Sequence, residues 1–114
     1  MDKQEMKRAY KESKRPMGVY SIKNLEDKRI FIGFSTDLNA IINRHKTELK
    51  FKNHRNRELQ EMWNSMDENC IKFEVLDGLD PEEKSQAEIR EELRTLTDMW
   101  IQKLASSGYK VIRL

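Results

Sequence analysis

The sequence is poor in cysteine, proline and glycine, and it has no long hydrophobic run. Its single cysteine, Cys70, excludes an internal disulfide. The two histidines and this cysteine do not have the spacing of a zinc site. No apolar stretch is long enough to cross a bilayer, and none has the pattern of a secretory signal. We therefore expect a cytoplasmic domain that makes no contact with a membrane.

Neither sign of charge dominates. The 22 lysines and arginines and the 20 acidic residues leave a net charge of +2, so the chain as a whole is not strongly basic. Charged residues make up 37% of the chain, which suits a small protein with well-solvated helix faces. The sequence also lacks internal repeats, low-complexity tracts and a glycine-rich phosphate loop. Its 114 residues predict one domain with one modest core.

Two β-rich runs lie close together near the N-terminus. Residues 19–22 and residues 30–34 are rich in β-branched and aromatic side chains, and residues 24–28 between them are polar turn formers. This spacing predicts an antiparallel hairpin. Gly18 and Gly33 lie near its outer ends, where a glycine within a strand often marks a bulge or a close approach of another group.

The rest of the chain alternates between helical and extended patterns. Apolar residues recur at helical spacing in three stretches, and residues 71–75 alternate between apolar and charged side chains. We predict an α+β domain over residues 16–114, with a small, three-stranded, mostly antiparallel sheet flanked by helices. The expected helices cover residues 37–50, a stretch around residues 59–66, and residues 82–105, with Gly108 ending the last one.

The first 15 residues form a separate predicted unit. Their pattern favours an extra N-terminal helix with a thin apolar edge, ended by Pro16. Basic residues outnumber acidic ones in this arm. It could contact phosphates, or it could be a solvated helix docked on the domain, and we favour the second interpretation.

Several short motifs are more specific than these patterns. The hairpin carries Gly18-Val19-Tyr20 and Phe31-Ile32-Gly33, which resembles the signature of the GIY-YIG nuclease family. The resemblance extends from about Met17 to Lys110 and includes two later blocks. These blocks are Asn56, Leu59, Gln60 and Trp63 on the second predicted helix, and Gly108-Tyr109 after the last one.

The resemblance implies phosphodiester cleavage, which in this family usually uses one divalent metal ion. It also implies a tyrosine on the hairpin beside the attacking water, an arginine on the first helix and a metal-binding glutamate on the last helix. Tyr20 matches the first tyrosine of the motif, and His45 falls where the family often carries a histidine. These two are the candidate catalytic residues.

Other family positions are substituted. Phe31 replaces the second tyrosine, Ile41 the arginine, Thr97 the glutamate and Lys110 the asparagine of the closing motif. Loss of a guanidinium alone typically costs phosphoryl-transfer chemistry several orders of magnitude in rate. We therefore predict a degenerate member with no metal ligands and no cofactor, in which magnesium or manganese would matter only if cleavage is retained.

A local basic cluster follows the hairpin. In the family this region lies near the substrate cleft, so DNA or RNA is the predicted partner, with phosphate contacts and no sequence readout. An ordinary solvated helix face is the alternative interpretation. The candidate nucleic-acid-binding residues are Arg44, Lys46, Lys50, Lys52, Arg55 and Arg57.

Three hypotheses remain open on the sequence. The leading one is a nucleic-acid-binding module on a degenerate nuclease frame. The second is an active nuclease that uses Tyr20, Arg44, His45 and a displaced carboxylate, for which Asp98 is a candidate. The third is a protein-interaction module, in which the basic N-terminal arm and the acidic last helix serve a protein partner.

Overall fold

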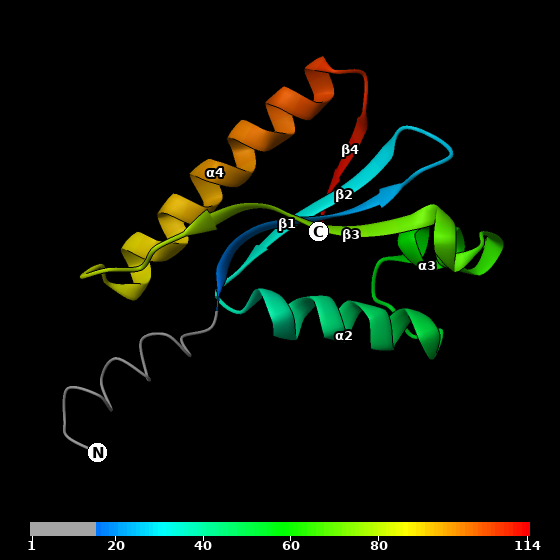
Figure 1. The fold of residues 1–114 in the computed structure, drawn as a ribbon, viewed down its shortest axis with the longest axis horizontal. Helices are drawn as coiled ribbons and strands as arrows, with labels where there is room; N and C mark the ends of the chain where they lie inside the picture. Colours follow the sequence, from blue (N-terminus) through cyan, green and yellow to red (C-terminus); the bar gives the residue numbers. More distant parts are fainter. Residues whose placement is uncertain (1–15) are drawn as a thin grey trace.

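A four-stranded sheet forms the centre of the structure, a computed structural model that describes residues 16–114. The strand order is β3-β1-β2-β4. Helix α4 covers one face of the sheet, and helices α2 and α3 cover the other (Figure 1). The predicted N-terminal arm lies outside the described residues. The strands are β1 (Met17–Asn24), β2 (Arg29–Ser35), β3 (Ile71–Leu79) and β4 (Lys110–Arg113), and the helices are α2 (Leu38–Lys50), α3 (Arg57–Ser65) and α4 (Gln86–Ser106).

The predicted fold class is confirmed, but the count of three strands was wrong. The hairpin of β1 and β2 is antiparallel, and β3 pairs antiparallel with β1. Strand β4 adds a fourth, parallel pairing, in which Phe31 lies opposite Ile112. Four residues at the end of the chain carry too little pattern to predict a strand, because their extended shape depends on pairing with β2. The sheet is therefore mixed.

A side-chain cap marks the start of each of the three described helices. Asp37 caps α2 by accepting a hydrogen bond from the Ala40 N–H at 3.1 Å, and Gly108, with φ of 93°, follows the end of α4. The predicted start of α4 at residue 82 was wrong, because Ser85 is its cap. None of the helices in the described range has the length and apolar composition needed to span a membrane.

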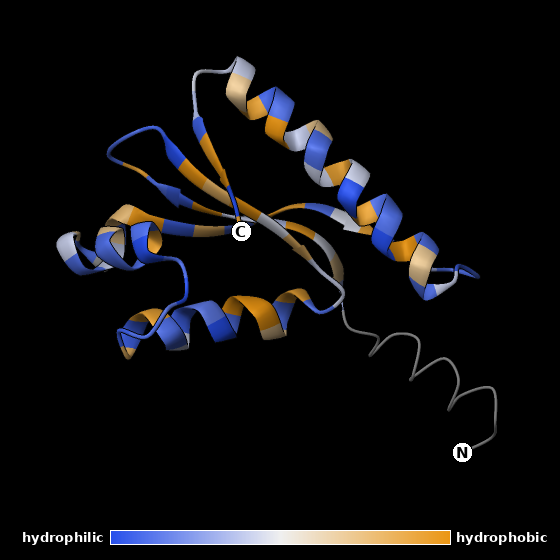
Figure 2. Cartoon of the chain, turned by 180° about the vertical axis from the view of Figure 1, so that it is seen from behind, coloured by the Kyte–Doolittle hydropathy of each residue, from blue (hydrophilic) through white to orange (hydrophobic). Residues whose placement is uncertain are grey.

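The alternation of side chains along the strands divides the core into two layers. Tyr20, Ile22 and Phe31 belong to a buried cluster with residues of α2 and α3. The intervening residues of β1 and β2 face α4, from which Leu93 and Thr97 are buried. Figure 2 shows hydrophobic residues concentrated along the central strands, whereas the helices mix both kinds. The side chains of Tyr20 and Thr97 therefore lie on opposite faces of the sheet.

Candidate functional site

Gly33 makes the space in which Tyr20 lies. The two residues are cross-strand partners in the β1–β2 hairpin. A Cβ atom at position 33 would lie 2.8 Å from the Tyr20 Oη and 3.0 Å from its Cζ, so the tyrosine ring lies across the bare backbone of β2. The ring is 3% exposed and is directed toward α2. The glycine of the second motif therefore places the hydroxyl of the first.

Tyr20 is the end of a chain of hydrogen bonds. Its Oη lies 2.6 Å from the Nε2 of His45, and the Nδ1 of His45 lies 2.7 Å from the Nε2 of His54. The backbone N–H of Asn56 donates to the Nδ1 of His54 at 2.9 Å. Because a backbone N–H can only donate, the proton of neutral His54 must be on Nε2. His54 then donates to His45, and His45 donates to the hydroxyl oxygen of Tyr20.

His54 was missing from the predicted site. Sequence reasoning placed it among the basic residues after α2, because nine residues and a loop separate it from His45. Its position is fixed by the start of α3. The backbone N–H of His54 donates to the Gln60 Oε1 at 3.0 Å, and the Gln60 Nε2 donates to the Leu49 carbonyl at 3.1 Å. The Gln60 that carried part of the family resemblance thus holds the second histidine in place.

Burial keeps this chain uncharged at neutral pH. It raises the pKa of Tyr20 to about 12. Burial, followed by the neighbouring His54, lowers the pKa of His45 to about 4, and burial also lowers the pKa of His54. Tyr20 is therefore a protonated phenol held by a neutral imidazole. As it stands, the group can orient a ligand and offer a proton, but it is a weak base.

A cavity of about 370 Å³ opens beside the two histidines. Arg44 lies at its edge and donates through Nε to the Glu48 Oε1 at 3.2 Å. Ile41 occupies the position where the resemblance implies an arginine, and its side chain presents only carbon to the cavity. The cavity is lined by Ile41, Arg44, His45, Glu48, His54, Arg55 and Leu114.

His45, Glu48 and His54 form a group of potential metal ligands in the described part of the chain. One ligand atom from each lies within 4.8 Å of the others. The His54 nitrogen that faces the group carries the proton of a hydrogen bond and therefore offers no lone pair. Magnesium and manganese prefer several oxygen ligands, and only one carboxylate is present. The geometry fits a hydrogen-bonded chain better than a metal site.

Phe31 and Thr97 are buried, and the candidate displaced carboxylate, Asp98, is paired. Phe31 is fully buried in the core. Thr97 is 1% exposed, and its Oγ1 donates to the Leu93 carbonyl at 2.7 Å. The neighbouring Asp98, the candidate displaced carboxylate, is exposed and is paired with Arg113 of β4. These residues do not fit the metal ion that the resemblance implies.

The six predicted nucleic-acid-binding residues do not form one patch. Arg44 and Arg55 line the cavity beside the histidines. Lys46 and Lys50 line a different hollow, on another side of α2. Lys52 and Arg57 are exposed and line neither.

Comparisons with known proteins bear directly on this site. A family model described as the GIY-YIG catalytic domain matches residues 16–109, which span the hairpin, His45, His54 and α4. The chain belongs to the GIY-YIG family. The match covers both motif strands and the positions of Ile41 and Thr97, so the substitutions lie within a recognisable member. The comparison with curated protein sequences found no match.

Two solved structures show the same fold. A mutant of the catalytic domain of the intron endonuclease I-TevI has a TM-score of 0.63 and 23% identity, covering 83% of this chain and 92% of that one. A second structure of the catalytic domain of the homing endonuclease I-TevI has a TM-score of 0.65 and 21% identity, covering 86% and 97%. At this identity the likeness shows the GIY-YIG fold alone, and it agrees with the match of the family model.

Replacing Gly33 with alanine is expected to disturb the Tyr20–His45–His54 chain. The added methyl would require the tyrosine ring to move, at a cost of about 1–3 kcal/mol of unfolding free energy. The measurement is urea denaturation together with the imidazole NMR signals of His45 and His54. Gly78→Ala is the matched control, because its added Cβ would meet its nearest neighbour at 3.9 Å. Equal effects of the two substitutions would contradict the role of Gly33.

Proposed function

We propose that this domain binds nucleic acid through basic residues around the Tyr20–His45–His54 chain and lacks the metal-dependent cleavage typical of its family. The single observation that carries the proposal is Thr97. It stands where the resemblance implies a metal-binding glutamate, is buried, and donates its hydroxyl proton to the helix backbone. A GIY-YIG frame that lacks this carboxylate keeps a surface for phosphates without the ion that activates cleavage.

The phenol of Tyr20 supports the same proposal. A tyrosine that acts as a base must lose its proton, and a pKa near 12 makes that loss unfavourable at neutral pH. A guanidinium at the family position would favour the phenolate, but Ile41 stands there. Of the two arginines that line the cavity, Arg44 donates its Nε to the Glu48 carboxylate, and Arg55 is exposed. The tyrosine is therefore suited to holding the imidazole of His45 in place at the wall of the cavity, and it is unsuited to acting as a base.

The surface chemistry suits phosphate contacts that carry no sequence information. Arg55 and Arg57 are exposed in the described structure, directly after the loop that holds His54. Both similar solved structures are of the catalytic domain of one endonuclease, I-TevI, and a nucleic-acid partner is plausible for the fold. Arg55 lines the cavity and Arg57 lies two residues farther along the chain, and phosphate contacts from both would add to affinity through release of counterions from the strand.

Salt-dependent binding that weakens in an Arg55→Ala/Arg57→Ala double variant is the expected result. Each lost phosphate contact should reduce the slope of log affinity against log salt by about one, so the double variant should lose about two. Gel shifts and cleavage would be followed in one series, with branched, duplex and single-stranded DNA and RNA, with magnesium or manganese and with chelator.

The control is the double variant Arg90→Ala/Arg94→Ala on α4, which removes two exposed arginines from the other face. If both double variants weakened nucleic-acid binding equally, the assignment of the binding surface to Arg55 and Arg57 would be contradicted. Metal-dependent products that disappear in Tyr20→Phe would overturn the loss of cleavage and favour an active nuclease. Absence of any shift would overturn nucleic-acid binding and favour a protein-interaction module.

A further inference from the structure

A second hollow lies on the other side of α2 from the histidines. Its volume is about 510 Å³, within the range of sites for small ligands. It shares no lining residue with the cavity beside His45. The hollow is lined by Lys46, Thr47, Lys50, Trp63, Asn69, Ile71, Lys72 and Phe73.

Two aromatic rings form the inner wall. Trp63 of α3 and Phe73 of β3 meet edge to face, with their ring centroids 6.5 Å apart and their planes at 70°. Both are half-buried, so each packs on the core and leaves part of its surface open. The Lys46 Nζ lies 5.0 Å from the centroid of Phe73, over its ring. Trp63 is therefore the ring with a face available to a ligand.

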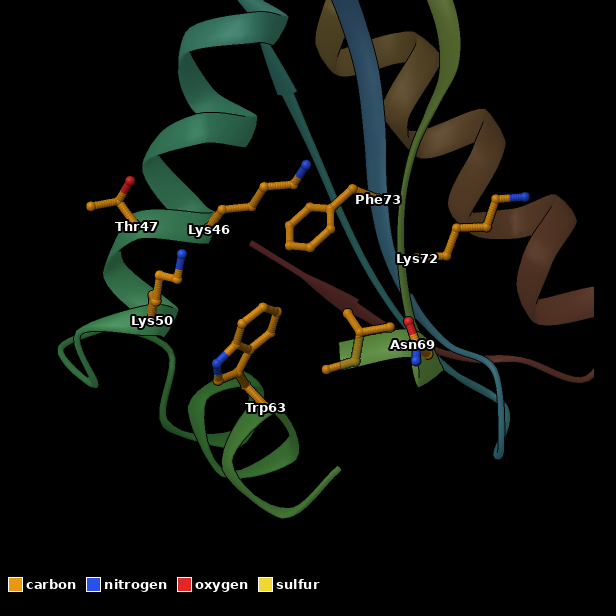
Figure 3. Close-up of a pocket in the computed structure, with 8 residues that line it drawn as sticks. Lys46, Thr47, Lys50, Trp63, Asn69, Lys72 and Phe73 are labelled. Carbon is orange, nitrogen blue, oxygen red and sulfur yellow. The ribbon is translucent and has the colours of Figure 1, made fainter. Parts of the chain in front are cut away.

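The rim is positively charged. None of the eight described residues that line the hollow is acidic, and three are lysines. Figure 3 shows Lys46 and Lys50 on the α2 side of the two rings, whereas Lys72 points away from them. The Lys72 Nζ lies 3.7 Å from a Glu74 carboxylate oxygen, so that lysine is already partly neutralised. Lys46 and Lys50 lie one helical turn apart and are the cations that face a ligand.

We propose that this hollow holds one unpaired nucleotide of a nucleic-acid strand, with its base stacked on Trp63 and its flanking phosphates near Lys46 and Lys50. A base has a flat, polarisable face that an indole ring stacks on, and its phosphates need cations at the edge of the same site. The amide of Asn69 lies at the rim and can hydrogen-bond to the edge of the base. A paired base is shielded by its neighbours, so the site selects single-stranded or unstacked segments.

This inference rests on the proposed function and names the form of nucleic acid that the domain prefers. It also gives Trp63 and Phe73 a role besides packing against the core. Trp63 and Phe73 contribute to packing with one side and to the hollow with the other. An acidic peptide would satisfy the lysines, but it would leave the indole face without a stacking partner.

The test uses the fluorescence of Trp63. In a Trp100→Phe background Trp63 is the only tryptophan, because the chain has two. A short oligothymidylate is expected to quench this signal, whereas an abasic strand of the same length is expected to bind about tenfold more weakly without quenching. Trp63→Leu should weaken oligothymidylate binding about tenfold and leave abasic binding unchanged. Lys50→Gln should weaken both and lower the salt slope by about one, while Lys103→Gln on α4 should change neither.

Three results would overturn the nucleotide site. Equal affinity for base-bearing and abasic strands without quenching, while duplex binding persists, would overturn the nucleotide site and leave nucleic-acid binding intact. Quenching and displacement by polyglutamate as strong as by oligothymidylate would overturn it in favour of an acidic protein partner. Absence of binding to every strand would overturn both proposals. If Trp63→Leu fails to fold, the quenching experiment and the exposed Lys50→Gln variant still decide.

Discussion

Gly18→Ala is expected to lose about 3 kcal/mol or more of unfolding free energy. The cause is backbone crowding between β1 and β3. A Cβ atom at position 18 would lie 1.9 Å from the Asp77 carbonyl oxygen, and the three nearest atoms are all main chain that no rotamer change can move. The pairing shifts register between Val19 and Tyr20, which leaves Leu76 without a partner in β1 and marks a bulge. The substitution would therefore push β1 and β3 apart at Gly18, two residues before Tyr20.

Gly78→Ala is the matched control, because Gly78 lies opposite Gly18 in the same strand pair. Its added Cβ would make ordinary contact at 3.9 Å, so the unfolding free energy should change by no more than about 1 kcal/mol. Alanine also reduces the conformational freedom of the unfolded chain, which acts to stabilise the fold. Chemical denaturation of both variants measures the difference. Similar stabilities would show that the close approach at Gly18 does not constrain the sheet.

Local chemistry explains how much of the fold could be predicted. The hairpin and the stop at Gly108 each depend on residues adjacent in sequence, and each is confirmed. The two motif glycines were predicted to mark a bulge or a close approach, and both do. Strand β4 could not be predicted, because it pairs with β2, whose residues lie about 80 positions earlier in the chain.

The candidate site was predictable only in part, for a similar reason. Tyr20 and His45 were found through motif positions, and the structure brings them into hydrogen-bond contact. The link to His54 depends on a loop whose path is set by Gln60, and no periodicity connects these residues. Thr97 lies one helical turn from Leu93, and both are buried. The two hollows on either side of α2 are formed by segments far apart in the chain, so local pattern could not predict them.

The stability of the domain is expected to fall by about 2 kcal/mol between pH 7.5 and pH 5 because of His45. The pKa of His45 is lowered to about 4 in the fold, whereas an unfolded histidine titrates near 6.5. Between these values the unfolded chain binds a proton that the folded chain rejects, so stability decreases as the pH falls from about 6.5 toward about 4. The pKa of His54 is lowered too, which adds in the same direction. Glu48 opposes the effect, while Arg44 and Arg55 strengthen it.

Urea denaturation at intervals across this pH range would measure the slope. His45→Gln keeps a side-chain N–H that can donate to the Tyr20 hydroxyl and removes the titration, so the slope should fall to what His54 contributes. His45→Gln/His54→Gln should be nearly flat down to about pH 5, because unfolded carboxyl groups titrate mainly below that value. A flat curve for the unsubstituted domain, or an unchanged slope in the double variant, would show that the two imidazoles are not held neutral. The phenol of Tyr20 would then face a positive charge, and its weakness as a base would need another explanation.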